Sequence, residues 1–288
     1  MKLSFIVLTY NNLAIATQPM VESLLPTTPQ RGTELIVVDN HSSDGTLEYF
    51  SKLQQSNPAI KIIANPENLG FSKGMNQGLA AAQGDVLILM NNDILFSTGW
   101  LELFLAVIRR PEVGLVSPQV NRLGDGCTAE NFQTRAAKCR LMCDDFVYQW
   151  FIPFCCVGLR REVFEKIGFL DEAFTPAYFE DNDYCLRSLY AGYKNAIALK
   201  SFVYHNHCQT TGQMADRKLI FERNQRQYYQ KHLLGQYIDQ LESSLKLLRK
   251  KTLQYRAKKW LIRLSSWFIL NPKKRKLYRK SLEFKFGL

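Results

Sequence analysis

Four short apolar runs in the first third of the chain are separated by segments of helical length. The runs span Leu3 to Tyr10, Glu34 to Asn40, Ile60 to Asn65 and Asp85 to Asn91. Strands that alternate with helices in this way build a mainly parallel sheet, because each strand returns to the sheet through a crossover helix. The sequence therefore predicts an α/β fold with a central sheet and flanking helices, in a chain of 288 residues that can bury a large core.

The last of these runs, DVLILMNND, leads directly into Asn91, Asn92 and Asp93. Such an apolar run is typical of a strand buried on both faces, so the three polar side chains are expected at its carboxyl end, where open α/β sheets bind ligands. A carboxylate beside two amides can hold a divalent cation, manganese or magnesium, together with substrate phosphates. The alternative is a turn or a cap of a helix that begins near Trp100, since Asn and Asp favour both.

Polar residues also follow the other predicted strands. Asp39 ends the second strand and precedes a turn that caps a helix from Thr46. The third strand is followed by Asn68 to Asn76, a glycine-bearing loop that can bring backbone amides and a lysine close to phosphate. The first strand runs into Thr9 to Asn12 without any glycine, so the G-x-G-x-x-G pattern of dinucleotide-binding folds is absent, as is the P-loop pattern.

The second half of the chain adds a cluster of acids and two histidines. Glu180, Asp181 and Asp183 lie together before an apparent helix. Neighbouring carboxylates raise one another's proton affinity, which suits a general base, although acids at a helix start are also favoured by the helix dipole alone. Farther on, the strand FVYHNH ends with His205 and His207, where a histidine can be a metal ligand or a structural residue.

Positive charge is concentrated at the carboxyl-terminal end of the chain. The net charge is +11, yet residues 240–288 contain 15 Lys or Arg and two acids, against 22 and 24 in residues 1–239. This asymmetry predicts a nearly neutral domain over residues 1–234 and a basic helical tail over residues 235–288.

The tail has three interpretations. In its segment KKWLIRLSSWFIL, a helix places five apolar side chains on one arc, and a cationic cluster follows at Lys273 to Lys276. The five are Trp260, Leu261, Leu264, Trp267 and Phe268. We favour binding to an anionic membrane surface, since tryptophan and cations beside an apolar face suit that interface. Packing on protein is the second interpretation, and nucleic acid is the least favoured partner.

The composition is that of a globular protein, with 46% hydrophobic and 22% charged residues. No segment approaches the roughly 18 apolar residues that span a bilayer, and the start of the chain lacks a signal cleavage site. The seven cysteines are odd in number and contain no CxxC pair, which argues against a disulfide framework and a zinc site. We therefore expect a cytoplasmic protein that is peripheral on the inner face of the cell membrane. Whether it forms homo-oligomers stays open.

The order of the motifs resembles that of family 2 glycosyltransferases with the GT-A fold. In chain order they are VLTYNN, IVVDNHSSDGT, NLGFSKGMNQGL, LILMNND, GLRREVFEKIGFLDEAF, FEDNDYCLR and a late VYH. The resemblance covers about residues 3–207 and is greatest to bacterial members that build cell-surface polysaccharides, including rhamnosyltransferase-like ones. Each motif by itself is weak evidence for the family. The resemblance is specific because all seven motifs occur in the family's order.

The resemblance implies a nucleotide site formed by the strand ends and the glycine-bearing loop. Asp39 would bind the base or ribose, and Asn91 replaces the first acid of the family's DxD motif, which leaves a less charged metal site. The residues assigned to the nucleotide and its phosphates are Thr9, Tyr10, Asn11, Asp39, Asn68, Gly70, Lys73, Asn91 and Asn92.

The resemblance also implies the metal ligands and the catalytic acids. Asp93, the last acid of the DxD motif, would hold the cation with the help of His205. Asp181 would be the catalytic base, and Glu180 would orient the sugar or the acceptor. The implied reaction is an inverting transfer from a UDP- or dTDP-type sugar to a hydroxyl of a glycan or lipid-linked acceptor.

Two other functions stay open at this point. A sugar-phosphate nucleotidyltransferase would also need a metal and a nucleotide, but it should carry a basic, glycine-rich loop after the first strand. A non-catalytic nucleotide- or glycan-binding module would keep the fold without needing Asp93, Asp181 and His205 together.

Overall fold

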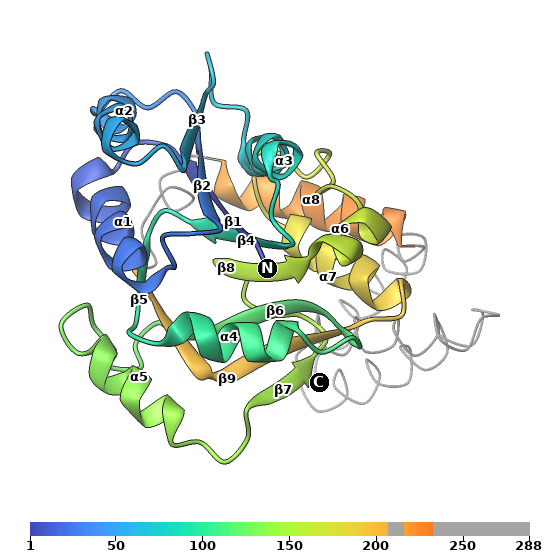
Figure 1. Ribbon diagram of the computed structural model, residues 1–288. Helices are drawn as coiled ribbons and strands as arrows, with labels where there is room; N and C mark the ends of the chain where they lie inside the picture. The colour runs from blue at the N-terminus through green and yellow to red at the C-terminus, as the bar shows by residue number, and fades with distance from the viewer. Residues whose placement is uncertain (207–215, 233–288) are drawn as a thin grey trace, which may run out of the picture. The chain divides into compact units, whose positions relative to one another are not determined.

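The computed structural model describes residues 1–206 and 216–232. These residues form one sheet whose strands run in the order β3-β2-β1-β4-β8-β6-β9-β5, with β7 paired to β9 (Figure 1). The strands are β1 (Leu3–Thr9), β2 (Thr33–Asp39), β3 (Ile60–Ala64), β4 (Val86–Asn91), β5 (Ile94–Phe96), β6 (Val113–Val120), β7 (Phe146–Gln149), β8 (Cys156–Arg160) and β9 (Lys194–His205).

Helices connect most of these strands. They are α1 (Gln18–Leu24), α2 (Thr46–Ser56), α3 (Phe71–Ala81), α4 (Trp100–Ile108), α5 (Phe132–Arg140), α6 (Arg161–Ile167), α7 (Glu180–Tyr190) and α8 (Arg217–Lys231). A π-helical turn, η1 (Leu13–Thr17), precedes α1, and a 3-10 turn, η2 (Leu25–Thr27), follows it. The four strands predicted from apolar runs are thus present, each within a residue of its predicted ends.

The two halves of the sheet differ in strand direction. β3, β2, β1 and β4 are parallel to their neighbours, as the alternation of strands and helices predicts. β8 then enters antiparallel to both β4 and β6, while β6 and β9 are parallel to each other. The predicted α/β fold is confirmed, and its second half is a mixed sheet.

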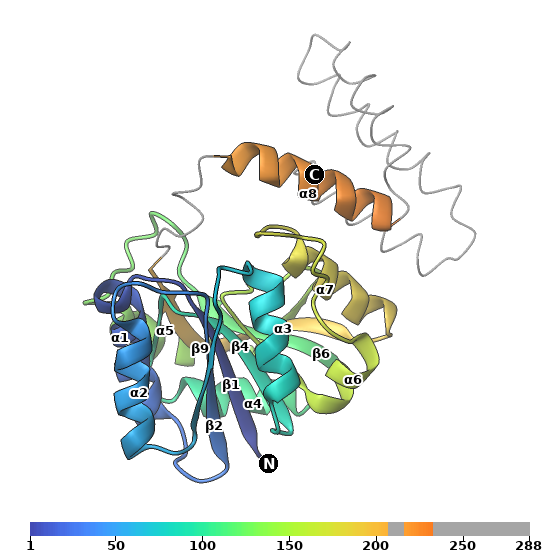
Figure 2. The same ribbon diagram turned by 90° about the horizontal axis from the view of Figure 1, so that it is seen from above.

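Both faces of the sheet are covered by helices, which explains why the strands are apolar throughout. Phe5 and Val7 of β1 pack in one core cluster with residues of α1, α2 and α4. Ile6, which points to the other face, packs in a second cluster with residues of α3, α6 and α7. Figure 2 shows β1 and β2 lying between α2 and α3. The alternation of side chains along each strand therefore supplies two cores at once.

The chain divides into two compact units, one of Met1–Arg217 and one that begins at Lys218. The predicted domain boundary at residues 234 and 235, and the aromatic arc around Trp260, lie outside the described residues. Within the described part, no helix has both the length and the apolar character that a membrane crossing requires.

Candidate active site

The carboxyl ends of β1, β2 and β4 meet at one edge of the sheet. The Cα partner of Thr9 is Asp39 on one side, and that of Leu8 is Asn91 on the other. Residues from three distant segments of the sequence therefore share this edge. It is the edge at which open α/β sheets bind ligands.

Asp39 is buried at this edge and held in one orientation. Asp39 is only 2% exposed. Its Oδ1 accepts a hydrogen bond from Thr9 Oγ1 at 2.9 Å. Its Oδ2 accepts one from the Ser42 amide at 3.0 Å, and the Ser42 hydroxyl donates to Oδ1. Asp39 is thus fixed as an acceptor at the base of the predicted nucleotide site.

Ser42 also connects the loops that follow β1 and β2. The Asn11 amide donates to Ser42 Oγ at 2.9 Å, and the Ser43 amide donates to Asn11 Oδ1 at 2.8 Å. Tyr10, which lies beside them, is 36% exposed. Ser42 was missing from the predicted site, although its position three residues after Asp39 is typical of a side chain that bonds back to a carboxylate.

The loop before α3 packs against the segment that leads to the acidic cluster. Asn68 Oδ1 accepts from the Gly70 amide at 2.9 Å and from Asn40 Nδ2 at 3.2 Å. Gly70 has φ +80°, and a Cβ there would lie 3.2 Å from the Cα and the carbonyl oxygen of Pro176. The Phe71 amide donates to the same carbonyl at 2.9 Å. Only glycine fits this position, for both conformational and steric reasons.

The other predicted nucleotide-site residues, Lys73, Asn91 and Asn92, differ in their exposure and hydrogen bonds. Lys73 is exposed in the first turn of α3. The backbone amide of Asn91, the last residue of β4, donates to the carbonyl of Cys155 at 2.8 Å. Asn92 Nδ2 donates to Thr17 Oγ1 at 2.9 Å, so this side chain anchors η1.

Asp93 and His205 face each other across β5 and β9. His205 is the last residue of β9 and pairs with Ile94 in the antiparallel ladder. This pairing brings His205 Nε2 to 3.1 Å from Asp93 Oδ1, and Asp93 is only 7% exposed. The two predicted metal ligands are therefore adjacent, although they lie in different halves of the sequence.

The distance between His205 Nε2 and Asp93 Oδ1 is that of an ion pair or a hydrogen bond, and it also allows both side chains to bind one divalent cation. Two ligands at right angles around an octahedral ion with bonds of about 2.1 Å lie about 3.0 Å apart, close to the observed separation. Within residues 1–206 and 216–232, no three His, Cys, Asp or Glu side chains gather to form a metal site. A cation held by Asp93 and His205 would take its remaining ligands from phosphate and water.

The acidic cluster forms the first turn of α7 rather than preceding a helix. Tyr178 and Phe179, just before it, have positive φ values of 78° and 73°, which are uncommon for aromatic residues and typical of strained functional segments. Glu180 and Asp183 are buried, whereas Asp181 is half-buried. The three acids thus have different surroundings.

Asp183 has a structural role. Its Oδ2 accepts from Arg187 Nε at 2.8 Å, and the Arg187 guanidinium also donates to the carbonyls of Ile167 and Phe169. This network ties α7 to the end of α6. Asp183 is therefore the weakest candidate for a base among the three acids.

The pKa values of Glu180 and Asp181 are both raised. Burial raises the pKa of Glu180 well above its usual value, and the negative charge of Asp181 raises it further. Burial also raises the pKa of Asp181, against the opposing effect of hydrogen bonds that include the Asn182 amide, 2.7 Å from Oδ1. The two carboxyls therefore form a pair that holds protons more tightly than exposed acids do.

Replacing Glu180 should change the pH dependence of stability. Because the pKa is raised in the folded state, the unfolded chain loses this proton first, and the free energy of unfolding falls as pH rises above about 4.5. Glu180→Gln removes the effect, so the variant should have a higher Tm than wild type at pH 8 and little advantage at pH 4.5. Thermal unfolding at a series of pH values tests this, with the exposed acid Glu165→Gln as control. An advantage that grows toward acid pH would contradict the expectation.

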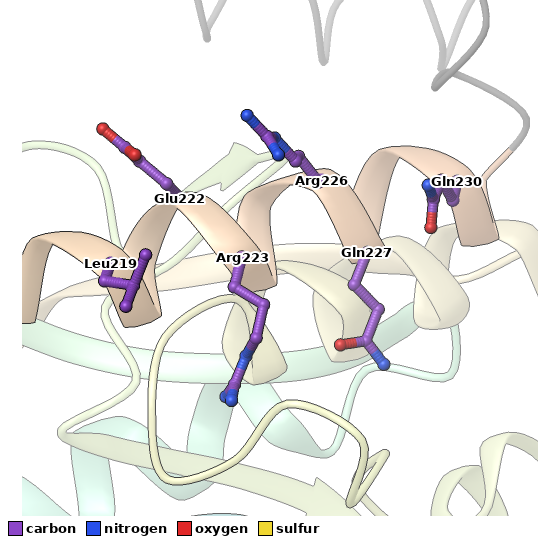
Figure 3. A pocket seen from close by; sticks show the side chains of 6 residues that line it. All are labelled: Leu219, Glu222, Arg223, Arg226, Gln227 and Gln230. Carbon is purple, nitrogen blue, oxygen red and sulfur yellow. The ribbon is translucent and has the colours of Figure 1, made fainter. Parts of the chain in front are cut away.

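A separate pocket of about 670 Å³ lies on the second unit (Figure 3). Its described lining comes from α8 alone, namely Leu219, Glu222, Arg223, Arg226, Gln227 and Gln230. None of the predicted site residues is among them. The described lining of this pocket therefore contains no part of the candidate active site.

Comparisons with known proteins bear on the family and the fold of the chain. The uncharacterized protein y4gI of Sinorhizobium fredii is 28% identical over 211 residues, which cover 67% of this chain but only 23% of that protein. Two solved structures share the fold at low sequence identity. TarS of S. aureus, in complex with UDP-GlcNAc, has a TM-score of 0.61 at 16% identity and covers 100% of this chain and 92% of that chain.

The second structure is the mannosyltransferase PcManGT of Pyrobaculum calidifontis, in complex with GDP-Man and Mn²⁺. It has a TM-score of 0.58 at 15% identity and covers 99% of this chain and 75% of that chain. The predicted GT-A fold is thereby confirmed. The model of Glycosyl transferase family 2 matches residues 4–168, more than half of the chain. The chain therefore belongs to glycosyl transferase family 2.

Proposed function

We propose that this protein is an inverting, metal-dependent glycosyltransferase that moves a sugar from a nucleotide-diphosphate sugar to an acceptor hydroxyl. The observation that carries the proposal is the approach of His205 Nε2 to Asp93 Oδ1, at 3.1 Å, on the sheet edge that also presents Asp39. The complexes of the structural neighbours with UDP-GlcNAc and with GDP-Man and Mn²⁺ support a sugar nucleotide and a cation.

The residues of the sheet edge would bind the donor. Asp39, fixed by Thr9 and Ser42, accepts hydrogen bonds from the base or ribose, and exposed Tyr10 offers a ring for stacking. Asn11, Asn68 and Gly70 lie in the loops expected around the nucleotide and its phosphates, and Lys73 lies in the first turn of α3. Asp93 and His205 would hold a divalent cation, which stabilises the charge that develops on the departing diphosphate.

Asp181 would act as the general base. It takes the proton from the acceptor hydroxyl as that oxygen bonds to the anomeric carbon and the bond to the diphosphate breaks. A raised pKa brings a carboxylate closer to the operating pH and makes it a better base. Glu180 is the other member of the pair of neighbouring carboxyls. When it is protonated, it can donate a hydrogen bond that orients the sugar or the acceptor. A single displacement of this kind inverts the anomeric carbon.

Two alternative functions, a nucleotidyltransferase and a non-catalytic binding module, predict other features than those of this chain. A nucleotidyltransferase should have a basic, glycine-rich loop after β1, where this chain has Tyr10, Asn11 and Asn12 leading into η1. A non-catalytic binding module has no need for a base or a cation at the sheet edge. The close approach of Asp93 and His205 favours the enzyme.

The acceptor and the place of action are part of the proposal. We place the reaction in the synthesis of cell-surface polysaccharide, at a glycan or lipid-linked acceptor on the cytoplasmic face of the membrane. The charge of the carboxyl-terminal tail supports this, since 15 Lys or Arg between residues 240 and 288 favour an anionic surface.

The proposal predicts slow, cation-dependent hydrolysis of one class of donor. The protein is incubated with UDP-, dTDP- and GDP-sugars and Mn²⁺, and release of the nucleoside diphosphate is measured. A glycosyltransferase should release it from one class of sugar nucleotide, because water replaces the missing acceptor. A binding module would bind nucleotide without release. Formation of a sugar nucleotide from sugar phosphate and nucleoside triphosphate would instead identify a nucleotidyltransferase.

A further inference from the structure

Asn121 makes two hydrogen bonds to the backbone of His205. Asn121 directly follows β6 and is 6% exposed. Its Nδ2 donates to the carbonyl of His205 at 3.0 Å, and its Oδ1 accepts from the amide of His205 at 2.7 Å. Both polar atoms of this side-chain amide are therefore used on one residue.

These two bonds extend the sheet beyond the end of β6. β6 and β9 pair in parallel as far as Val120 and Val203, and β9 continues alone on that side to His205. The Asn121 side chain offers one donor and one acceptor in the arrangement of a peptide group, so it replaces the strand partner that His205 would otherwise lack on this side. On its other side, His205 pairs with Ile94 of β5.

The backbone that carries the His205 ring is held from two sides. The amide of Asn206 donates to the carbonyl of Asp93 at 2.9 Å, which links the two segments from the β5 side. Asn121 fixes the same backbone from the β6 side. Groups that orient a metal ligand in this way commonly change metal affinity by 10- to 100-fold, although they never touch the ion.

We propose that Asn121 is a positioning residue that holds His205 in place to bind the divalent cation. The inference rests on the proposed function, since it assigns His205 to a cation. Asn121 is not itself a ligand, because both of its polar side-chain atoms already bond to the His205 backbone.

Asn195 provides a matched control. It is also a buried asparagine at the sheet, and its Nδ2 donates to two backbone carbonyls, those of Trp150 and Cys185, each at 3.0 Å. Asn195→Ala should therefore lower stability as Asn121→Ala does, without any effect on His205. The comparison separates positioning of the ligand from a general loss of buried hydrogen bonds.

The experiment measures binding of Mn²⁺ in the presence of UDP, by the loss of the electron paramagnetic resonance signal of free Mn²⁺, for the full chain. Asn121→Ala should weaken Mn²⁺ binding by 10-fold or more, and Asn195→Ala by less than twofold. Asn121→Gln keeps a donor and an acceptor but places them one methylene farther from the backbone, so its bonds to His205 are misaligned and the loss should be of intermediate size. If Asn121→Ala does not fold, this variant carries the test.

The link through His205 is tested in a His205→Ala background. There, Asn121→Ala should cause no further loss of Mn²⁺ affinity, because the residue that it positions is already gone. Three outcomes would overturn the positioning role of Asn121 but not the proposed metal site. They are wild-type Mn²⁺ affinity in Asn121→Ala, an equal loss of affinity in Asn195→Ala, and a full additional loss in the His205→Ala background. A wild-type protein that binds no Mn²⁺ with UDP or with GDP would overturn the proposed metal site together with it.

Discussion

Asp181→Asn is expected to lower the rate of sugar transfer by roughly 10²- to 10⁴-fold, the range typical of removing a general base. Asparagine keeps the shape of the side chain but cannot accept the proton of the attacking hydroxyl. Binding of the nucleotide should be nearly unchanged, because Asp181 lies on α7 and the residues around Asp39 lie on β1 and β2. The measurements are the transfer rate with saturating donor and, separately, the Kd of the nucleoside diphosphate.

The neighbouring acids serve as controls. Asp183→Asn should reduce thermal stability, because Arg187, which also bonds to the end of α6, loses its charged partner within α7. The variant should retain much more activity than Asp181→Asn. If Asp181→Asn were as active as wild type while Glu180→Gln or Asp183→Asn was inactive, the base would be another carboxylate. A product that retains the anomeric configuration of the donor would reject the single displacement.

Removal of the metal site should have an effect of similar size. EDTA is expected to abolish turnover and Mn²⁺ or Mg²⁺ to restore it, because the charge on the departing diphosphate would otherwise be left without a counterion. Asp93→Ala should lower kcat/KM by at least about 10²-fold, as expected when several kcal/mol of transition-state stabilisation is lost. The assay is the release of nucleoside diphosphate as a function of cation concentration.

Asp85 gives the control for this prediction. It precedes the same strand, β4, but lies at the opposite end, where its Oδ2 accepts from the Lys2 amide at 2.7 Å. Asp85→Ala removes a carboxylate from the protein without touching the sheet edge that carries Asp93. It should therefore keep the cation dependence of wild type. Full activity of the wild-type enzyme in EDTA would exclude the proposed role of Asp93 and His205.

The sequence by itself determined the parallel half of the sheet and the edge at which we place the candidate site. The run from Val86 to Met90 is apolar at every position, which is typical of a strand covered on both faces. The polar residues that end these runs, Asp39 and Asp93 among them, then have to lie at the carboxyl edge. Both conclusions depend only on residues that are close together in the sequence. The periodicity of apolar residues and the residues at the strand ends were therefore sufficient to predict them.

Tertiary structure alone decided how the second half of the chain completes the site. The approach of His205 to Asp93 depends on the register of β9 against β5, and the support by Asn121 depends on where β6 ends beside β9. Sequence spacing carries no information on such registers, because the pairing partners are remote and several offsets satisfy the same apolar pattern.

The different surroundings of the acidic cluster were likewise decided by the fold. Composition and spacing do not distinguish Glu180, Asp181 and Asp183, and only the family resemblance assigns them different roles. In the structure, Asp183 is bonded to Arg187, while burial raises the pKa of Glu180 and of Asp181. Desolvation and charge pairing depend on which side chains pack around each carboxyl in three dimensions, and this packing separates a structural acid from a candidate base.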